Sequence, residues 1–249
     1  MTHTPGGFLA LWNGIRDPKR EAEYETWHAF EHVPERVGSP GFVWARRYAA
    51  CRAGDTPTYF TLYALEGVEA LLTPRYQALI DHPSAWSASM REQLTDFCRE
   101  PCVTTGSHGP SEASLLAPLR LRLPDTVALS QLDAWLGQEV EAGRLVQATL
   151  GQCDGRSAHP LGHQSQADAP SGGVEAVALL SDFRRAALAT AIVKLEAALP
   201  QQIAGAALRA RPIVHQLQSA VRQSELPHPV DARQPPRPDL HQQFHQGDH

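Results

Sequence analysis

The sequence predicts an α+β protein made of two tandem ferredoxin-like units that pack sheet to sheet, followed by a disordered C-terminal tail. The predicted elements run β-α-β-β-α-β through residues 1–108, and the same order recurs through residues 109–220. Two such sheets would bury against each other the faces that their helices leave bare. From residue 221 onward, Pro, His and Gln replace aliphatic residues, and a segment of that composition cannot offset its ordering entropy.

The first unit opens with a strand and a helix. Residues 8–13 (FLALWN) form a continuous apolar run, as expected of a strand buried on both faces. Asp17 is a suitable N-cap and Pro18 fits the first helical position, so a helix should begin there. Pro34 cannot donate to the preceding turn, and with the sequence GSPG after it, it should end the helix.

A hairpin, a broken helix and a last strand should complete the first unit. Residues 42–50 and 58–66 flank the turn sequence RAGDTP, which is typical of a hairpin. Residues 68–97 are expected to be helical with breaks at two prolines. A short strand at residues 101–105 should close the unit.

The second unit repeats this order with little sequence identity. Its first helix carries apolar residues at helical spacing, and its second is rich in strong helix formers. Strands are expected at residues 115–123, 144–152, 174–183 and 207–217, and helices at residues 126–143 and 184–199.

The composition excludes several classes of function. The chain has 249 residues, 42% of them hydrophobic, and a formal net charge of -5, with no basic stripe for nucleic acid or an anionic membrane. No stretch approaches the roughly 18 continuous apolar residues of a membrane span, and the N-terminus lacks a signal-peptide pattern, so a cytoplasmic protein is expected. Of four cysteines only Cys98 and Cys102 are close in sequence, which predicts reduced thiols rather than a metal site.

The segment YETWHAFEHVPER, residues 24–36, holds the candidate chemistry. On a helical wheel its residues divide into a sheet-facing arc and an adjoining polar arc. His28 and His32 are four residues apart and are therefore neighbours at the border of the buried face. The sheet-facing arc contains Trp27, Phe30, Val33, Pro34 and Val37, and the polar arc contains Tyr24, His28, Glu31, His32 and Glu35.

Three interpretations of the histidine pair remain open. The residues can be the polar shoulder of an amphipathic helix. They can also form an acid–base site, in which Glu31 or Glu35 fixes the tautomer of a histidine and Tyr24 donates to a developing oxyanion. The third interpretation is a metal site, but HAFEH differs from the H-E-x-x-H pattern and no third ligand is apparent. No metal and no cofactor are therefore expected.

Several stretches of the first unit, taken together, resemble the EthD-like branch of the dimeric α+β barrel superfamily. They are FLALWNGI, the segment of residues 24–50, PTYFTLYALE and TPRYQALIDHPSAW, and the marks within them are WHAFEH, PER, PGF and ARRY. The second unit is similar to the superfamily only in the order of its elements, and it has no counterpart of EHVPER.

This resemblance implies a dimeric α+β barrel closed within one chain, as an intramolecular pseudo-dimer, with a further homodimer left open. The superfamily includes cofactor-free isomerases, cyclases and decarboxylases, quinone-forming monooxygenases and haem-binding enzymes. In its cofactor-free members a histidine commonly acts as base, helped by Tyr or Arg. Matched residue by residue, the motif points to His32 more than to His28.

Residues that could bind a substrate lie on two neighbouring strands. Arg46 and Arg47 alternate along the first of these strands, so one of them faces the helices and could anchor a carboxylate or phenolate. The next strand and the helix opposite it contribute Tyr59, Thr61, Tyr63 and Trp27.

The expected function is that of a cofactor-independent lyase or isomerase acting on a small, aromatic-derived carbonyl compound. His32 would move a proton next to the carbonyl, His28 and Glu31 would tune it, and Tyr24 would stabilise the oxyanion. The small-molecule substrate is the only partner expected.

Two alternatives accompany that expectation. One is a haem-binding or O₂-using monooxygenase of the same fold, with His215, His159 or His163 as candidate axial ligands. The other is a non-catalytic carrier of a small molecule. The histidines of the tail are expected to be solvated, and they are His228, His241, His245 and His249.

Overall fold

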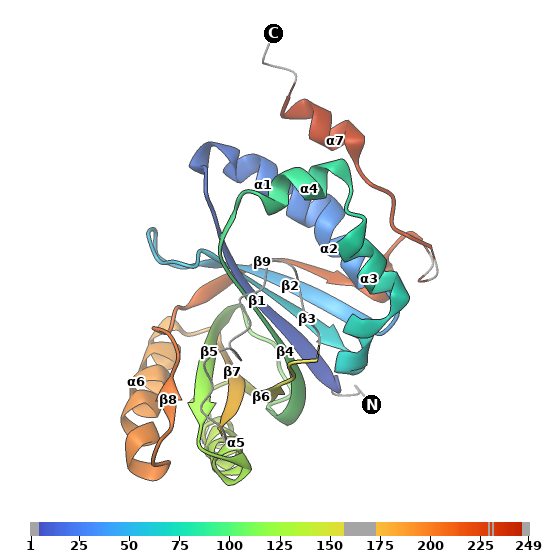
Figure 1. Ribbon diagram of the computed structural model, residues 1–249. Helices are drawn as coiled ribbons and strands as arrows, with labels where there is room; N and C mark the ends of the chain where they lie inside the picture. Colours follow the sequence, from blue (N-terminus) through green and yellow to red (C-terminus); the bar gives the residue numbers. More distant parts are fainter. Residues whose placement is uncertain (1–4, 157–172, 229, 231, 246–249) are drawn as a thin grey trace.

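The computed structural model describes residues 5–156, 173–228, 230 and 232–245 (Figure 1). Its helices gather in two groups with a barrel of strands between them (Figure 1). Three histidines considered above, His159, His163 and His249, lie outside the described residues.

The helices of the first half begin where the capping signals predict. The Asp17 carboxylate accepts from the backbone N–H of Lys19, and the hydroxyls of Thr73 and Ser84 cap the next two helices in the same way. In chain order the elements are β1 (Gly7–Ile15), a 3-10 turn (Pro18–Arg20), α1 (Glu21–Trp27), a π-helical turn (His28–His32), α2 (Val33–Val37), β2 (Phe42–Ala50), β3 (Tyr59–Leu65), a 3-10 turn (Val68–Leu72), α3 (Pro74–Asp81), α4 (Ala85–Arg91) and β4 (Leu94–His108).

The second half repeats the order of elements and then adds a tail. Its first helix begins at an Asp125 cap, whose carboxylate accepts from the backbone N–H of Ala128 at 2.8 Å. The elements are β5 (Leu115–Leu123), α5 (Thr126–Glu141), β6 (Gln147–Cys153), β7 (Val174–Asp182), α6 (Arg185–Gln202), β8 (Ala207–Leu208), β9 (His215–Arg222), a 3-10 turn (Gln223–Glu225) and α7 (Pro238–Gln243).

Eight of the described strands close into one antiparallel barrel. The order is β7-β6-β4-β1-β3-β2-β9-β5, and pairing of β5 with β7 closes the circle, while β8 adds to the edge of β5. The halves join at two seams, where Cys102 pairs with Cys153 between β4 and β6, and Tyr48 pairs with Leu217 between β2 and β9. The two sheets were expected to stack, but their edges also pair, so that the barrel is continuous.

Strand alternation divides the side chains between the barrel lumen and two outer cores. In β1, Phe8 and Trp12 point into the lumen, where they pack in an apolar cluster that both halves share. Leu9 and Asn13 point outward, under the helices of the first half. A second outer core, rich in Leu and Ala, lies between β5–β7 and the helices α5 and α6.

The long strand β4 replaces the end of a helix that the sequence was expected to form. Helix α4 ends at Arg91, and residues 94–108 are extended, so the prediction of a helix to residue 97 was wrong. The side chains of Phe97 and Arg99 face the helices, while that of Cys98 faces the lumen. This alternation is the signature of a strand, and the polar residues between the apolar ones hid it.

The C-terminal tail also differs from the expectation of disorder. Its first residues complete β9, and the chain then returns across the helices of the first half, where α7 lies (Figure 1). The backbone N–H of Arg237 donates to the Glu31 carboxylate at 2.7 Å, and the Arg233 guanidinium pairs with Glu35 at 2.6 Å. Both carboxylates are buried. The tail is therefore held by polar anchors, which a count of aliphatic residues does not detect.

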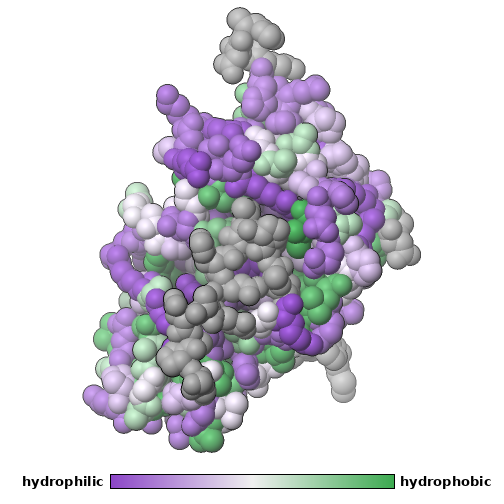
Figure 2. All heavy atoms as spheres, viewed as in Figure 1, coloured by the Kyte–Doolittle hydropathy of each residue, from purple (hydrophilic) through white to green (hydrophobic). Residues whose placement is uncertain are grey.

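None of the helices in the described ranges is long and apolar enough to span a membrane. On the face drawn in Figure 2, hydrophilic and hydrophobic side chains intermingle, and hydrophilic ones prevail over the helices of the first half.

Acid should destabilise the protein through His215, which is fully buried at the start of β9. Its Nδ1 donates to the Ile213 carbonyl at 3.1 Å, and burial lowers its pKa to about 4. Between pH 6.5 and about 4 the unfolded chain binds a proton that the native state refuses, so stability falls as pH falls through this window. We expect this histidine to account for a loss of about 3 kcal/mol by pH 4.

Urea unfolding of wild type and His215→Asn at several pH values measures this contribution. The variant keeps a donor near the Nδ1 position, and its stability should fall less steeply between pH 6.5 and 4. Replacement of the exposed His82 by Asn is the control and should leave the wild-type slope unchanged. Parallel curves for wild type and His215→Asn would refute the assignment.

Candidate functional site

A π-helical turn places the histidine pair. The backbone N–H of Val33 donates to the carbonyl of His28, five residues earlier, so residues 28–32 turn less per residue than an α-helix does. Phe30, which the helical wheel put toward the sheet, is 57% exposed, while His28 and Glu31 are each 3% exposed. The expected sheet-facing position of Phe30 was therefore wrong. Such turns occur frequently at functional sites.

The histidine pair lines a pocket between the first-half helices and the outer faces of β1, β3 and β4. The enclosed free space is about 30 Å³, enough for one or two water molecules, so the pocket is nearly closed in this structure. Half of its lining residues carry aromatic rings when the two imidazoles are included. The lining residues are Leu9, Leu11, Asn13, Tyr24, Trp27, His28, His32, Arg36, Tyr63, Tyr76, Arg91, Leu94, Phe97 and Arg99.

The two imidazoles stack on each other inside an aromatic row. Their ring centroids are 5.2 Å apart with an interplanar angle of 28°. Trp27 packs against His32 at 4.2 Å, and Tyr24 lies 5.4 Å from His28. The Nε2 atom of His28 is 3.5 Å from the hydroxyl of Thr61, and its buried Nδ1 atom has no hydrogen-bond partner among the described residues.

His28 is neutral at neutral pH. Burial lowers its pKa well below the ordinary 6.5, and the positive charges of Arg47 and Arg36 lower it further. In the tautomer whose Nε2–H donates to the Thr61 hydroxyl, the Nδ1 atom is the proton acceptor; in the other tautomer the two nitrogens exchange these roles. The same two arginines that disfavour an imidazolium would favour an anion bound beside it.

The three tyrosines of the site differ in what their hydroxyls contact. The hydroxyl of Tyr24 is hydrogen-bonded to the Asn13 side chain at 2.9 Å, and that of Tyr59 donates to Glu21 at 2.7 Å. The hydroxyl of Tyr63 is buried at the pocket with no partner in the described part of the chain. Burial raises the pKa of all three, so each is protonated and Tyr63 has a hydroxyl to offer a ligand.

Neither glutamate orients His28 in the described part of the chain, which corrects the roles of Glu31 and Glu35 expected at that histidine. Glu31 accepts from the hydroxyls of Ser84 and Ser87 on α4, and from the tail. Glu35 pairs with Arg36 at 2.9 Å and with the tail. The carboxylates hold helices and tail together, and the hydroxyl of Thr61 occupies the orienting position beside His28.

The two neighbouring strand arginines point to opposite faces, as the alternation predicted. Arg47 faces the helices, where it pairs with Glu25 and lies over the rings of Tyr59 and Tyr24 at 4.6 and 5.2 Å. Arg46 faces the lumen, pairs with Glu112 and lies 4.0 Å over the ring of Trp44. Arg46 is therefore not part of the histidine pocket.

Several lining residues were missed by sequence reasoning. Asn13 could have been found from the alternation of β1, in which it follows Leu9 and Leu11 on one face. Phe97 was hidden by the expectation of a helix to residue 97, and Arg99 lies between that helix and the strand expected from residue 101. Arg91 has a structural role, since its guanidinium donates to the carbonyls that end α3.

The barrel lumen contains a larger cavity of about 460 Å³ that the sequence did not predict. Both halves contribute to its wall, which includes Trp44, Arg46, Tyr48, Thr149 and Ser181. No histidine or cysteine lines it among the described residues. It is separate from the histidine pocket, because the strands lie between the two.

Comparison with known proteins supports the fold. No family profile and no curated protein matches the sequence. An anthrone oxidase-like protein superposes with a TM-score of 0.59 at 8% identity, covering 90% of this chain and 95% of that one. Chlorite dismutase from Candidatus Nitrospira defluvii, in complex with imidazole, gives a TM-score of 0.53 at 8% identity, covering 98% and 97%. The chain thus has the expected dimeric α+β barrel fold.

The expectation of a cofactor-independent lyase or isomerase is wrong. The solved structures with this fold are named as an oxidase-like protein and a dismutase, which agrees better with the alternative of a haem-binding or O₂-using enzyme.

Phenylalanine substitutions at Tyr24 and Tyr63 test whether their hydroxyls are hydrogen-bonded as the structure shows. Tyr24→Phe removes a partner of Asn13 and should lower the free energy of unfolding by about 1 kcal/mol or more. Tyr63→Phe removes a hydroxyl that the protein leaves unpaired, so the variant should be as stable as wild type or slightly more stable. Urea denaturation measures both. A Tyr63→Phe variant that loses as much stability as Tyr24→Phe would contradict the assignment.

Proposed function

We propose that the protein is an O₂-consuming oxidase or monooxygenase of a planar, electron-rich aromatic compound, bound between the first-half helices and the outer face of β1, β3 and β4. One observation carries the proposal. His28 is a buried, neutral histidine with an unpaired Nδ1, and it lies in an aromatic-walled pocket within the positive field of Arg36 and Arg47.

The walls favour a flat aromatic substrate. Rings of Tyr24, Trp27, Tyr63, Tyr76 and Phe97 surround the pocket, and aromatic pairs gain from offset or edge-to-face contact beyond the area they bury. The polar and charged groups among these rings can fix the orientation of a bound ligand, and they are Asn13, His28, His32, Arg36, Arg91 and Arg99.

The residues suit removal of a proton followed by reaction with O₂. His28 Nδ1 accepts the proton from an activated ring CH₂ or phenol, while Arg36 and Arg47 stabilise the resulting enolate or phenolate. The Tyr63 hydroxyl donates to the substrate oxygen. For a CH₂ substrate the balance is R₂CH₂ + O₂ → R₂C=O + H₂O, in which the carbon loses four electrons and O₂ accepts them.

His28, rather than His32, is the base in this proposal. His28 is more deeply buried, and its Nε2 faces Thr61, which leaves Nδ1 to accept. His32 stacks between His28 and Trp27 and forms part of the wall. The name of the anthrone oxidase-like protein supports the substrate class, because an anthrone is a flat aromatic ketone with an activated CH₂.

The described residues do not fit haem. The histidine pocket has about 30 Å³ of free space, and the cavity beside His215 has about 100 Å³, against roughly 300 Å³ or more for ordinary ligand pockets. A resident prosthetic group needs a cavity of its own size. The lumen cavity is large enough but has no histidine or cysteine in its described wall, and neither α5 nor α6 contains a histidine.

A substrate, unlike a resident group, can enter a pocket that closes in its absence. The cover consists of α3, α4 and the tail, which is held to Glu31 and Glu35 by few contacts. Closure after entry would exclude water and strengthen the field of the arginines.

The internal repeat of the chain and the family origin of its first half are also part of this proposal. The strand order β4-β1-β3-β2 of the first half recurs as β9-β5-β7-β6 in the second, which supports two ferredoxin-like repeats. The WHAFEH and PER marks support an EthD-like origin of the first half.

Oxygen uptake tests the proposed function. We expect consumption of O₂ with at least one class among anthrones, hydroquinones and naphthols, measured with an oxygen electrode and by absorbance of the product. His28→Gln should lower kcat by about 10²–10⁴, because it removes the positioned base. His108→Gln is the matched control, since His108 pairs with Asp133 outside the pocket, and it should keep wild-type activity.

Two results would refute the proposal. One is the lack of O₂ uptake above the protein-free rate with every class. The other is full activity of a folded His28→Gln variant.

A further inference from the structure

We propose that Glu23, His241 and His245 bind a divalent cation of the zinc class, which fastens the tail helix α7 to α1 and α4. This site is separate from the histidine pocket and does not depend on the proposed oxidase function. It joins residues that are more than 200 positions apart in the sequence.

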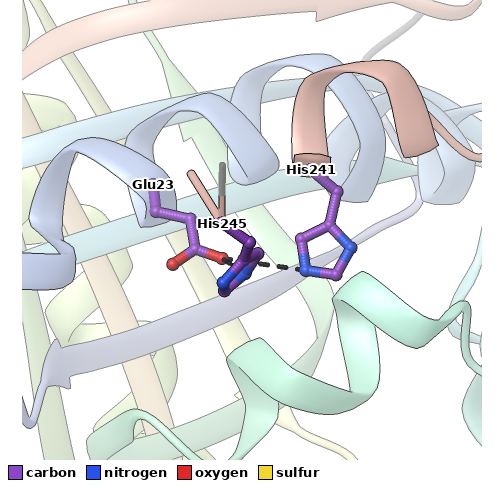
Figure 3. Close-up of side chains that lie close together, drawn as sticks. All are labelled: Glu23, His241 and His245. Carbon is purple, nitrogen blue, oxygen red and sulfur yellow. Dashed lines mark ion pairs between the residues drawn. The ribbon is translucent and has the colours of Figure 1, made fainter. Parts of the chain in front are cut away.

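The three side chains converge on one point (Figure 3). Nε2 of His245 lies 3.5 Å from Oε1 of Glu23, and Nε2 of His241 lies 4.0 Å from the same oxygen. One ligand atom from each residue lies within 4.8 Å of the other two, and no other group of three His, Cys, Asp or Glu in the described ranges does so. The pair His28 and His32 therefore lacks a third ligand, while the tail pair has one.

The spacing is close to that of an occupied site. Bonds of 2.0–2.2 Å to zinc in a tetrahedron separate ligand atoms by about 3.3 Å. Rotation of the side chains covers the difference, and His245, whose side chain is 49% exposed, has room to move. Two histidines four residues apart and one distant glutamate form the His₂Glu donor set that zinc enzymes use, with a fourth position open to water.

Neighbouring groups hold two of the ligands in place. His241 stacks on the indole of Trp86 at 5.2 Å with an interplanar angle of 18°, and Trp86 Nε1 donates to Glu23 Oε1 at 3.1 Å. Arg20 donates to both oxygens of Glu23, from Nε to Oε2 at 2.8 Å and from Nη2 to Oε1 at 3.0 Å. Oε1, which faces the histidines, therefore also accepts from Arg20 and Trp86, and a cation would share this oxygen with those donors. Such contacts around a site fix the orientation of its ligands. The Arg20 charge opposes the cation and would moderate its affinity.

Occupation of the site would strengthen the cover of the histidine pocket. The tail is already fixed at Glu31 and Glu35, and the cation would add a third attachment nearer its end. His241 departs from the expected solvated state even without the cation, because it stacks on Trp86 and its side chain is 24% exposed, while the side chain of His245 is 49% exposed.

Zinc titration of the full-length protein tests the site. Isothermal titration calorimetry should give one zinc ion per chain, and Glu23→Gln, His241→Ala and His245→Ala should each weaken binding about tenfold or more. His228→Ala is the control, because His228 is an exposed tail histidine outside the cluster, and it should bind zinc as wild type does.

Hydrogen exchange supplies an independent readout. Zinc should slow exchange of the backbone amides of residues 239–243 in wild type but not in Glu23→Gln or His245→Ala. Because the side chain of His245 is half-exposed, the His245→Ala variant should fold normally. The test therefore remains valid even if Glu23→Gln perturbs folding. Zinc binding that Glu23→Gln leaves unchanged, binding lost equally in His228→Ala, or no binding at all would overturn the proposal.

Discussion

Pairing of strand edges at the two seams of the barrel is the constraint on which the rest of the structure depends. Because β4 pairs with β6 and β2 pairs with β9, the eight strands have no open edge at the joints between the halves. Closure then fixes which residue of each strand faces the lumen and which faces the helices. The first half thereby presents Asn13, Thr61, Tyr63 and Arg99 outward, beneath one continuous helical segment.

Charged side chains buried beneath the helices determine the electrostatic properties of the histidine pocket. Arg47 is held under α1 by Glu25 and by two tyrosine rings. Burial lowers the pKa of His28, and the charges of Arg47 and Arg36 lower it further. The π-helical turn brings that histidine inward and turns Phe30 out. Glu31 and Glu35, which were expected to have catalytic roles, instead anchor the tail. A small set of buried ionic groups therefore both holds the tail in place and determines the charge around the pocket.

The sequence supports the order of elements and most strand faces, because apolar periodicity and capping residues act locally. The Asp17 cap and the opposite orientations of Arg46 and Arg47 follow from such signals. Features that depend on contacts between residues distant in sequence could not be predicted from such local signals. A π turn has no sequence signature that a wheel of constant angle detects, and the tail is ordered by carboxylates some 200 residues earlier. The lumen cavity arises only when both halves contribute their walls.

The central claim is that the substrate binds beside His28, beneath the helices of the first half. The location of a bound substrate tests this claim most directly. A crystal structure with a hydroxylated anthrone or a hydroquinone would show whether the ligand occupies the histidine pocket or the lumen cavity. We expect the ring system between the helices and the outer face of the strands, with an oxygen at the Tyr63 hydroxyl and the reacting group at His28 Nδ1. A ligand seated in the lumen between Trp44 and Arg46, with the histidine pocket still closed, would contradict this account.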